Sequence, residues 1–239
     1  MDVRDWYRRV YSFNLYNRNR WVAAWAARLP SQSKVLDVGA GTGRYRSLFA
    51  HCDYYAHDFG QTPTLADKYT RLDYQSDITD IPVPDETFDV ILLSEVLEHV
   101  PDPTKAVKEM ARILRGGGRL LLTAPLASFL HQEPYHFYGG YTPHWYRKFL
   151  PQAGFEIESI EANRGFFSLF GQEAVRFSAS IAPRQTVHKG VLTWIGLTIL
   201  WLITLPFLRG LFPLIGGLMD RLELEQIATV GYHVVARKG

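Results

Sequence analysis

The sequence contains almost no cysteine and almost no net charge. Cys52 is the one cysteine among 239 residues, so neither an intrachain disulfide nor a cysteine-rich zinc site can form. Lys and Arg number 26 against 24 Asp and Glu, a formal charge of +2, which argues against nucleic-acid binding by bulk electrostatics. Apolar residues make up 47% and aromatic residues 14%, which excludes a disordered chain. The length predicts one large domain, or one domain with an insertion.

A secretory signal is also missing. The first residues mix Asp2, Asp5, Arg8 and Arg9 with aromatic side chains, so they form no apolar signal core, and we expect a cytoplasmic protein. Residues 190–208 contain no charged side chain. That run is close to the ~18 apolar residues that suggest a membrane span.

Short apolar runs alternate with helical patterns between residues 34 and 162, which is typical of β/α units around a parallel sheet. The expected strands are 34–38, 54–57, 72–74, 88–93, 119–123, 155–162 and, last, 229–237. Asp102-Pro103 and Thr142-Pro143 predict helix starts. The triplet 116–118 is expected to end the first of these helices, and Gly154 the second.

We therefore predict a doubly wound α/β fold whose seven-stranded sheet is mostly parallel, with an apolar helical insertion before the last strand. The composition changes near Gly190 and returns at Asp220. We expect an N-terminal helical cap at 1–33, the α/β domain at 34–162 and 220–239, and the insertion at 163–219.

A glycine-rich loop follows the first expected strand and precedes an expected helix. Gly39, Gly41 and Gly43 alternate there, and glycine lets a backbone turn sharply and approach a ligand closely. A helix N-terminus at the carboxyl end of a strand favours a nucleotide-like ligand. The dinucleotide fingerprint would need glycine at Arg44 or Arg46, and the Gly-Lys-Ser/Thr of a phosphate loop is absent, so both readings fail.

At these residues the chain resembles the class I S-adenosylmethionine-dependent methyltransferases, and the resemblance extends over residues 34–162. Residues 37–43 resemble the family's first motif, which cradles the methionine part of the cofactor S-adenosylmethionine. By the same resemblance, the carboxylate of Asp58 accepts hydrogen bonds from the ribose hydroxyls. Asp77 would accept from the adenine edge, and Ile78 would pack on its ring. The implied cofactor-binding residues are Asp37, Gly39, Gly41, Gly43, Asp58, Asp77, Ile78 and Ser94.

Three histidines are the candidates for the chemistry, because methyl transfer to oxygen or carbon needs alignment and removal of a proton. His99 follows the fourth strand, and His131 and His136 lie in the aromatic segment after the fifth. We favour His136 as the base or a substrate contact; a merely packed histidine is the alternative. His131, Glu133 and His136 lack the spacing of a helical zinc motif, and Pro134 prevents that helix, so no metal is expected.

The apolar insertion has three open interpretations: a membrane surface contact, a dimer-forming helix pair, or a cap over an apolar substrate pocket. A single crossing would leave the last strand outside the sheet, and 210–219 is too short to cross back. An in-plane or re-entrant hairpin is therefore expected, bent at Pro206 and Arg209-Gly210. Trp194 and Trp201 would lie at the interface, with His188, Lys189 and Arg209 near anionic headgroups.

These observations predict a cytoplasmic methyltransferase, peripheral at the membrane, that acts on a small or lipid-like acceptor, at oxygen. Its alternatives are a methyltransferase for a soluble small molecule or sugar, with the insertion forming a homodimer, and a catalytically silent cofactor-binding module. Nucleic acid is not expected as substrate, because no Asn/Asp-Pro-Pro-aromatic motif follows the fourth strand.

Overall fold

The structure is a computed structural model that describes residues 2–62, 68–183, 190–222 and 228–239. It divides into two compact units. The α/β unit comprises Arg18–Asn163 and Gly231–Gly239, and the helical unit comprises Met1–Asn17 and Arg164–Val230. This division differs from the expected domain boundaries, since it falls within helix α2 (Phe13–Ala26) and assigns residues 220–230 to the insertion.

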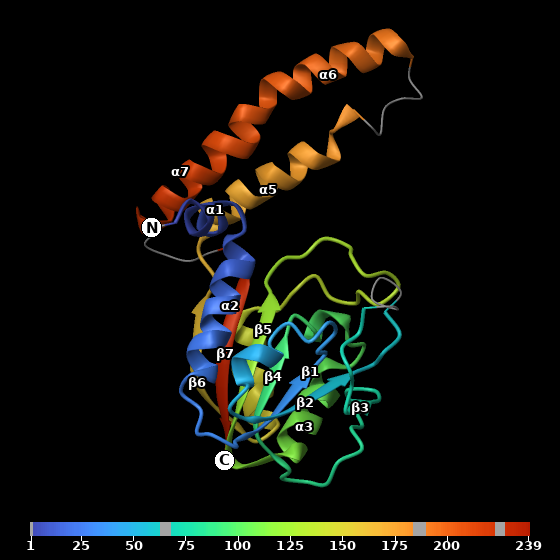
Figure 1. The fold of residues 1–239 in the computed structure, drawn as a ribbon, viewed down its shortest axis with the longest axis vertical. Helices are drawn as coiled ribbons and strands as arrows, with labels where there is room; N and C mark the ends of the chain where they lie inside the picture. The colour runs from blue at the N-terminus through green and yellow to red at the C-terminus, as the bar shows by residue number, and fades with distance from the viewer. Residues whose placement is uncertain (1, 63–67, 184–189, 223–227) are drawn as a thin grey trace. The chain divides into compact units, whose positions relative to one another are not determined.

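The α/β unit contains the predicted seven-stranded sheet, in the order β3-β2-β1-β4-β5-β7-β6 (Figure 1). Strand β7 pairs antiparallel with both β5 and β6, and the other described pairings are parallel. The strands are β1 (Lys34–Val38), β2 (Asp53–Asp58), β3 (Tyr74–Gln75), β4 (Phe88–Ser94), β5 (Leu114–Pro125), β6 (Phe155–Ala162) and β7 (Gly231–Lys238).

Both predicted helix starts are confirmed. Asp102 Oδ1 accepts the Lys105 backbone N–H at 2.9 Å and caps α3 (Pro103–Ile113). Thr142 Oγ1 accepts the Trp145 N–H at 3.4 Å and caps α4 (Pro143–Gln152).

Two details near glycines differ from expectation. The triplet 116–118 does not end α3, which stops at Ile113; the glycines lie inside β5, where the register with β4 shifts. The helix expected after the glycine loop is only the 3-10 turn η1 (Arg46–Phe49), because β2 begins at Asp53 and leaves room for little more than one turn.

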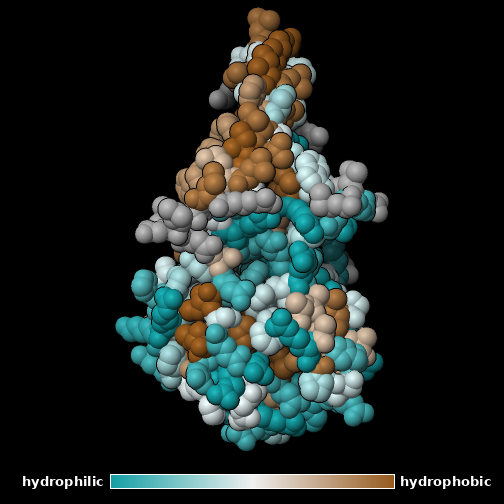
Figure 2. Space-filling view, turned by 90° about the vertical axis from the view of Figure 1, so that its left-hand side faces the viewer, coloured by the Kyte–Doolittle hydropathy of each residue, from teal (hydrophilic) through white to brown (hydrophobic). Residues whose placement is uncertain are grey.

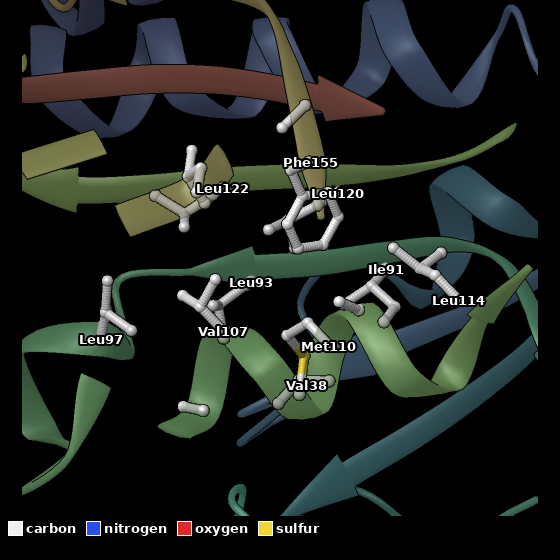
Figure 3. Packing of buried hydrophobic residues seen from close by; sticks show 14 of the residues in the cluster. Val38, Ile91, Leu93, Leu97, Val107, Met110, Leu114, Leu120, Leu122 and Phe155 are labelled. Carbon is white, nitrogen blue, oxygen red and sulfur yellow. The ribbon is translucent and has the colours of Figure 1, made fainter. Parts of the chain in front are cut away.

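The core fixes the strands whose carboxyl ends form the site. Figure 3 shows Val107 and Met110 of α3 packed against side chains of β4 and β5, among them Leu93 and Leu122. All four are fully buried, as expected for a sheet covered on both faces.

The helical unit is built around a long hairpin. Its outgoing arm is α5 (Phe166–Ser180), and its return arm is one continuous helix, Val191–Met219, made of α6 (Val191–Leu205), η6 (Pro206–Leu211) and α7 (Phe212–Met219). Figure 1 shows the two arms running side by side in opposite directions. We call α5 and the return arm the apolar hairpin. The unit also contains α1 (Val3–Tyr11) and η7 (Asp220–Leu222).

The bend expected at Pro206 and Arg209-Gly210 is wrong, because the chain stays helical through both places. Pro206 is the first residue of the π-helical segment η6. Proline has no backbone N–H to donate, and the different hydrogen-bond spacing of a π-helix tolerates this missing donor. The reversal falls between α5 and α6. His188 and Lys189, expected to flank the apolar run, lie outside the described residues.

Small residues let the two arms approach closely. A Cβ on Gly171 would come within 2.8 Å of the Pro213 Cα, and a Cβ on Gly216 within 2.3 Å of the Phe167 carbonyl oxygen. Further along, the fully buried Ser178 binds the return arm through two hydrogen bonds. Its Oγ accepts from Arg209 Nε at 2.6 Å, and its carbonyl accepts from Trp201 Nε1 at 2.7 Å.

Asp220 joins the two ends of the apolar hairpin. Its carboxylate accepts the Ser168 N–H at 2.9 Å and the Gly165 N–H at 3.3 Å. Because the N-cap of α5 is Gly165, which has no side chain, Asp220 supplies the missing cap from the far end of the return arm.

Substitution of Gly216 by Ala is expected to loosen the hairpin, since the new methyl group meets backbone rather than a flexible side chain. We expect a loss of about 1–3 kcal/mol in unfolding free energy and faster proteolytic cleavage within 166–219. The adjacent Gly217→Ala is the matched control, because nothing lies within 4 Å of its added Cβ. Equal melting temperatures and equal cleavage rates for the two variants would contradict the packing described.

Candidate functional site

A cavity of about 250 Å³ opens at the carboxyl ends of β1, β2 and β4, where ligands bind in open α/β sheets. The glycine loop, the end of β2 and the segment after β4 each contribute to its wall. Its lining consists of Val38, Gly39, Gly41, His57, Asp58, Phe59, Thr62, Asp77, Ile78, Glu95, Val96, His99, Val100, Pro101, Gln132, Tyr135 and Phe137.

The glycine loop has the conformation that its sequence predicts. Gly39, Gly41 and Gly43 have φ values of 73°, 50° and 69°, in the left-handed region that favours glycine. The loop is also crowded at its start, where a Cβ on Gly39 would stand 2.3 Å from Val96 Cγ2. Any other residue at position 39 would therefore be strained and would push Val96, which lines the cavity.

Asp58 holds the loop and still faces the cavity. One carboxylate oxygen accepts the Gly41 N–H and the other the Gly60 N–H, each at 3.0 Å. An ionised carboxylate offers about four acceptor positions, so two remain for a ligand diol. This position suits the ribose-binding role that the sequence implies for Asp58.

Asp77 and Ile78 also line the cavity, as expected. The Asp77 carboxylate lies at the surface of this wall and accepts both the N–H and the hydroxyl of Thr79 at 2.8 Å through Oδ1. Its Oδ2 takes part in neither of these hydrogen bonds.

Three implied cofactor residues do not belong to the lining: Asp37, Gly43 and Ser94. Asp37 is buried and accepts a 2.6 Å hydrogen bond from the Tyr54 hydroxyl; burial raises its pKa to about 7. The Ser94 hydroxyl bonds Thr123 Oγ1 at 3.0 Å, and the next residue, Glu95, lines the cavity.

Sequence reasoning passed over Glu95 and His57. Glu95 has an unusual positive φ of 56°, and its carboxylate is held by Arg18 Nη1 at 2.7 Å and by the Thr123 hydroxyl at 2.9 Å. Such backbone strain is typical of functional sites. No motif in the sequence marked the residue, because the strain depends on tertiary contacts.

His57 lines the cavity and has a ring nitrogen without a hydrogen-bond partner among the described residues. The Ser76 hydroxyl donates to the Asp77 carbonyl at 3.2 Å, so His57 Nε2–H must donate to Ser76 Oγ at 3.1 Å. Nδ1 then carries the lone pair, and it is buried without a partner in the described structure. Burial lowers the pKa of His57 to about 4, which keeps the ring neutral at physiological pH.

The three candidate histidines lie together at the cavity's edge. The ring centroid of His131 is 4.8 Å from that of His99 and 4.7 Å from that of His136, and His99 and His136 are 5.8 Å apart. Only His99 lines the cavity. Burial lowers the pKa of His99 and of His136, and neighbouring imidazoles lower both further, so both rings are bases rather than cations near neutral pH.

Hydrogen bonds assign the lone pairs of these rings. The Nδ1 atoms of His99 and His131 face the carbonyl oxygens of Tyr135 and Phe129, which only accept, so each Nδ1 carries the proton and each Nε2 the lone pair. Ser128 donates to the Gly139 carbonyl at 3.1 Å and accepts from His136 Nε2–H at 3.0 Å. The lone pair of His136 is therefore on Nδ1.

The segment that carries His131 and His136 is fastened to the turn η3 (Leu97–His99). The Glu98 carbonyl accepts the N–H groups of Phe137 and Tyr138, at 3.0 and 3.2 Å. The Tyr141 hydroxyl donates to the Leu97 carbonyl at 2.7 Å. The Glu98 side chain is 2% exposed, and burial, followed by the negative charge of Glu95, raises its pKa to about 8.

Part of the chain that forms this cavity is similar to known methyltransferases. Residues 36–122 match the family model of a methyltransferase domain. A "probable S-adenosylmethionine-dependent methyltransferase" of Mycobacterium tuberculosis is 33% identical over 96 residues, 38% of this chain and 35% of the relative. A ubiquinone/menaquinone biosynthesis C-methyltransferase of Geobacter sulfurreducens is 28% identical over 210 residues, 77% of this chain and 78% of the relative.

Among solved structures, the [4+2]-cyclase SpnF has a TM-score of 0.57 at 20% identity, covering 92% of this chain and 80% of its own, which shows the fold alone. The match to the M. tuberculosis relative spans only about a third of that protein's length. Within its α/β unit, the chain is thus similar to S-adenosylmethionine-dependent methyltransferases over residues 36–122.

The residues present fit the cofactor that this family uses. Gly39 lets the loop pack against Val96 in the cavity wall, and each carboxylate oxygen of Asp58 accepts one backbone N–H and so retains a further acceptor position. Gly41, Asp77 and Ile78 lie on the same wall. These residues would hold S-adenosylmethionine.

The contrast between Asp58 and Asp37 provides a test. Asp58→Asn is expected to weaken S-adenosylmethionine binding about 10- to 100-fold, because charge-assisted hydrogen bonds contribute about 1.5–3 kcal/mol. Asp37→Asn, which lies outside the lining and keeps an acceptor for Tyr54, should change the dissociation constant less than about twofold. Isothermal titration calorimetry would measure both. A larger loss from Asp37→Asn than from Asp58→Asn would reverse this assignment.

Proposed function

We propose that the protein is an S-adenosylmethionine-dependent methyltransferase that acts at a membrane face on a lipid-like acceptor. The observation that carries the proposal is the apolar hairpin, whose hydrophobic side chains point outward. In α6 none of the described side chains is buried. Large apolar residues at least 50% exposed in the hairpin are Phe170, Phe177, Val191, Leu192, Ile199, Leu200, Leu202, Ile203, Phe207 and Leu218.

Figure 2 shows hydrophobic colour concentrated on the helices of the hairpin, whereas the visible face of the α/β unit is mostly hydrophilic. Monomeric soluble proteins rarely expose large contiguous apolar patches, which mark interaction or membrane sites. The most apolar 18-residue window of the return arm has a mean hydropathy of 2.1, and none of that window is buried. Arg209 is the one charged residue of the return arm.

The shape of the hairpin favours entry and exit through one face of the bilayer. At ~1.5 Å per residue, the 29-residue return arm is about 43 Å long, more than the ~30 Å hydrocarbon core. Yet Asp220 bonds the first residues of α5, so both ends of the hairpin lie together. This arrangement supports a re-entrant or surface-lying hairpin, with the protein peripheral on the cytoplasmic side.

The histidine cluster supports a reaction that needs proton removal. When bound, the cofactor supplies a methyl group that is activated by a sulfonium. His99 lines the cavity, and the ring of His136, whose lone pair is on Nδ1, has its centroid 5.8 Å from that of His99. The His136 imidazole would take the proton of the acceptor. Tyr135 and Phe137 give the wall beside His99 an aromatic surface suited to a ring-bearing acceptor.

Oxygen is the expected methylated atom, and carbon is the second candidate. The relative from G. sulfurreducens that matches most of this chain is named as a quinone-biosynthesis C-methyltransferase. A base at the cavity serves either atom, since both a hydroxyl and an activated ring carbon release a proton on methylation.

Methyl-labelled S-adenosylmethionine, incubated with the full-length protein and an extract of its own cells, is expected to place label in the organic phase. His136→Ala should lower turnover about 10²- to 10⁴-fold, the usual contribution of a general base, while cofactor affinity stays unchanged. Label confined to small aqueous compounds would instead support the soluble acceptor and a dimerising hairpin. Cofactor binding without transfer to any acceptor would overturn the catalytic proposal and favour a silent binding module.

Ile203→Asp is expected to weaken binding to phospholipid vesicles about 50- to 300-fold, since an aspartate in the bilayer core costs about 2.5–3.5 kcal/mol. Ile203 is 60% exposed, so the fold should tolerate the change. Gln152→Asp, which adds the same charge to an exposed position of α4, is the control. Flotation with vesicles measures both variants, and an intact protein that never floats would refute membrane contact.

A further inference from the structure

We infer that Glu98, His99 and His131 form a binding site for a divalent transition-metal ion of the zinc type. The site goes beyond the proposed function and does not depend on it. One ligand atom from each of the three residues can be chosen so that all three lie within 4.8 Å of one another. The sequence did not bring them together, since Glu98 lies more than thirty residues before His131.

The distances need only a small adjustment to hold an ion. Bonds of 2.0–2.2 Å to a tetrahedral ion place its ligand atoms about 3.3 Å apart. Glu98 Oε1 and His99 Nε2 are 3.8 Å apart. His131 already contributes a ligand atom within 4.8 Å of the other two, and its ring is exposed.

Both histidines are in the tautomer that binds a metal. A metal-ligating histidine usually donates its other N–H to a carbonyl or carboxylate, which fixes the ring. Here the Tyr135 carbonyl holds His99 Nδ1–H, and the Phe129 carbonyl holds His131 Nδ1–H at 2.8 Å. The two Nε2 lone pairs are left for the ion.

The buried side chain of Glu98 is a second indication of a bound cation, separate from the distances between the ligand atoms. Its side chain is 2% exposed, and its Oε2 is buried without a hydrogen-bond partner among the described residues. A buried carboxylate oxygen with no partner is costly, and a bound ion is one of the ordinary explanations. A cation beside Glu98 would satisfy this oxygen by binding the carboxylate in place of a proton.

The ligand set indicates the kind of ion. Two imidazoles with one carboxylate suit zinc and its neighbours in the first transition row, whereas magnesium and calcium prefer oxygen ligands. Three protein ligands are typical of zinc sites that keep a position open for water or substrate. Because His99 also lines the cavity, an acceptor oxygen could occupy that position.

The test is metal binding by the full-length protein after chelator treatment, titrated with Zn²⁺ by calorimetry and with Co²⁺ by visible absorption. We expect one equivalent per chain and a rise in melting temperature. His131→Ala and Glu98→Gln should each weaken Zn²⁺ binding more than about tenfold. His131→Ala alters a surface side chain, so it keeps the test valid if Glu98→Gln fails to fold.

Two variants serve as matched controls. Glu133→Gln removes a carboxylate from the same segment, and His144→Ala removes an exposed histidine from α4; neither should change Zn²⁺ affinity. Absence of stoichiometric binding, or His131→Ala binding as tightly as the parent, would overturn the site. Weakening by Glu133→Gln instead of Glu98→Gln would also overturn it and assign the ion to His131, Glu133 and His136. S-adenosylmethionine binding, titrated separately, reports on the proposed function independently of every metal result.

Discussion

The insertion of β7 between β5 and β6 is the constraint on which the rest of the chain depends. The last strand pairs along its length with both neighbours, so the chain must return to the sheet after the apolar segment. Asn163 N–H closes this return by donating to the Gly231 carbonyl at 2.9 Å. An insertion that starts and ends at one place can fold as a hairpin but cannot cross a bilayer once. The topology of the sheet therefore determines how the hydrophobic segment can meet a membrane.

The same sheet creates the site by bringing distant short segments to one edge. The glycine loop, the end of β2 and the turn after β4 are each too short to bind a ligand alone. Asp58 links two of these segments through backbone N–H groups, and Glu95 links the third to Arg18 and Thr123. Polar groups that already hold one another need little reorganisation when a ligand arrives, which is how a fold prepares a binding site in advance.

The sequence predicted what is local and periodic. Strands 34–38 and 155–162 match β1 and β6, and the helix starts at Pro103 and Pro143 are as expected, because buried strands and capped helix starts depend on neighbouring residues. Ser94 is not part of the cavity lining, because its hydroxyl bonds Thr123 of the neighbouring strand, a tertiary contact that no local pattern predicts. The predicted bend at Pro206 was wrong because α5, the helix against which this part of the return arm packs, was not predicted. With α5 as a packing partner, the chain continues through Pro206 as the π-helical segment η6. The sequence did not mark Glu98 as a candidate ligand, because the fold alone brings it close to His131, which lies in a distant segment.

The close contact of the two hairpin arms has a consequence for the membrane contact that we propose. Helices in water associate by burying apolar surface, a driving force that disappears in hydrocarbon, whereas backbone approach at small residues and interhelical hydrogen bonds persist there. Gly171, Gly216 and the Ser178–Arg209 pair are contacts of the second kind. In the proposed membrane contact, the hairpin would therefore enter the lipid with the helix packing that it already has in water, without refolding.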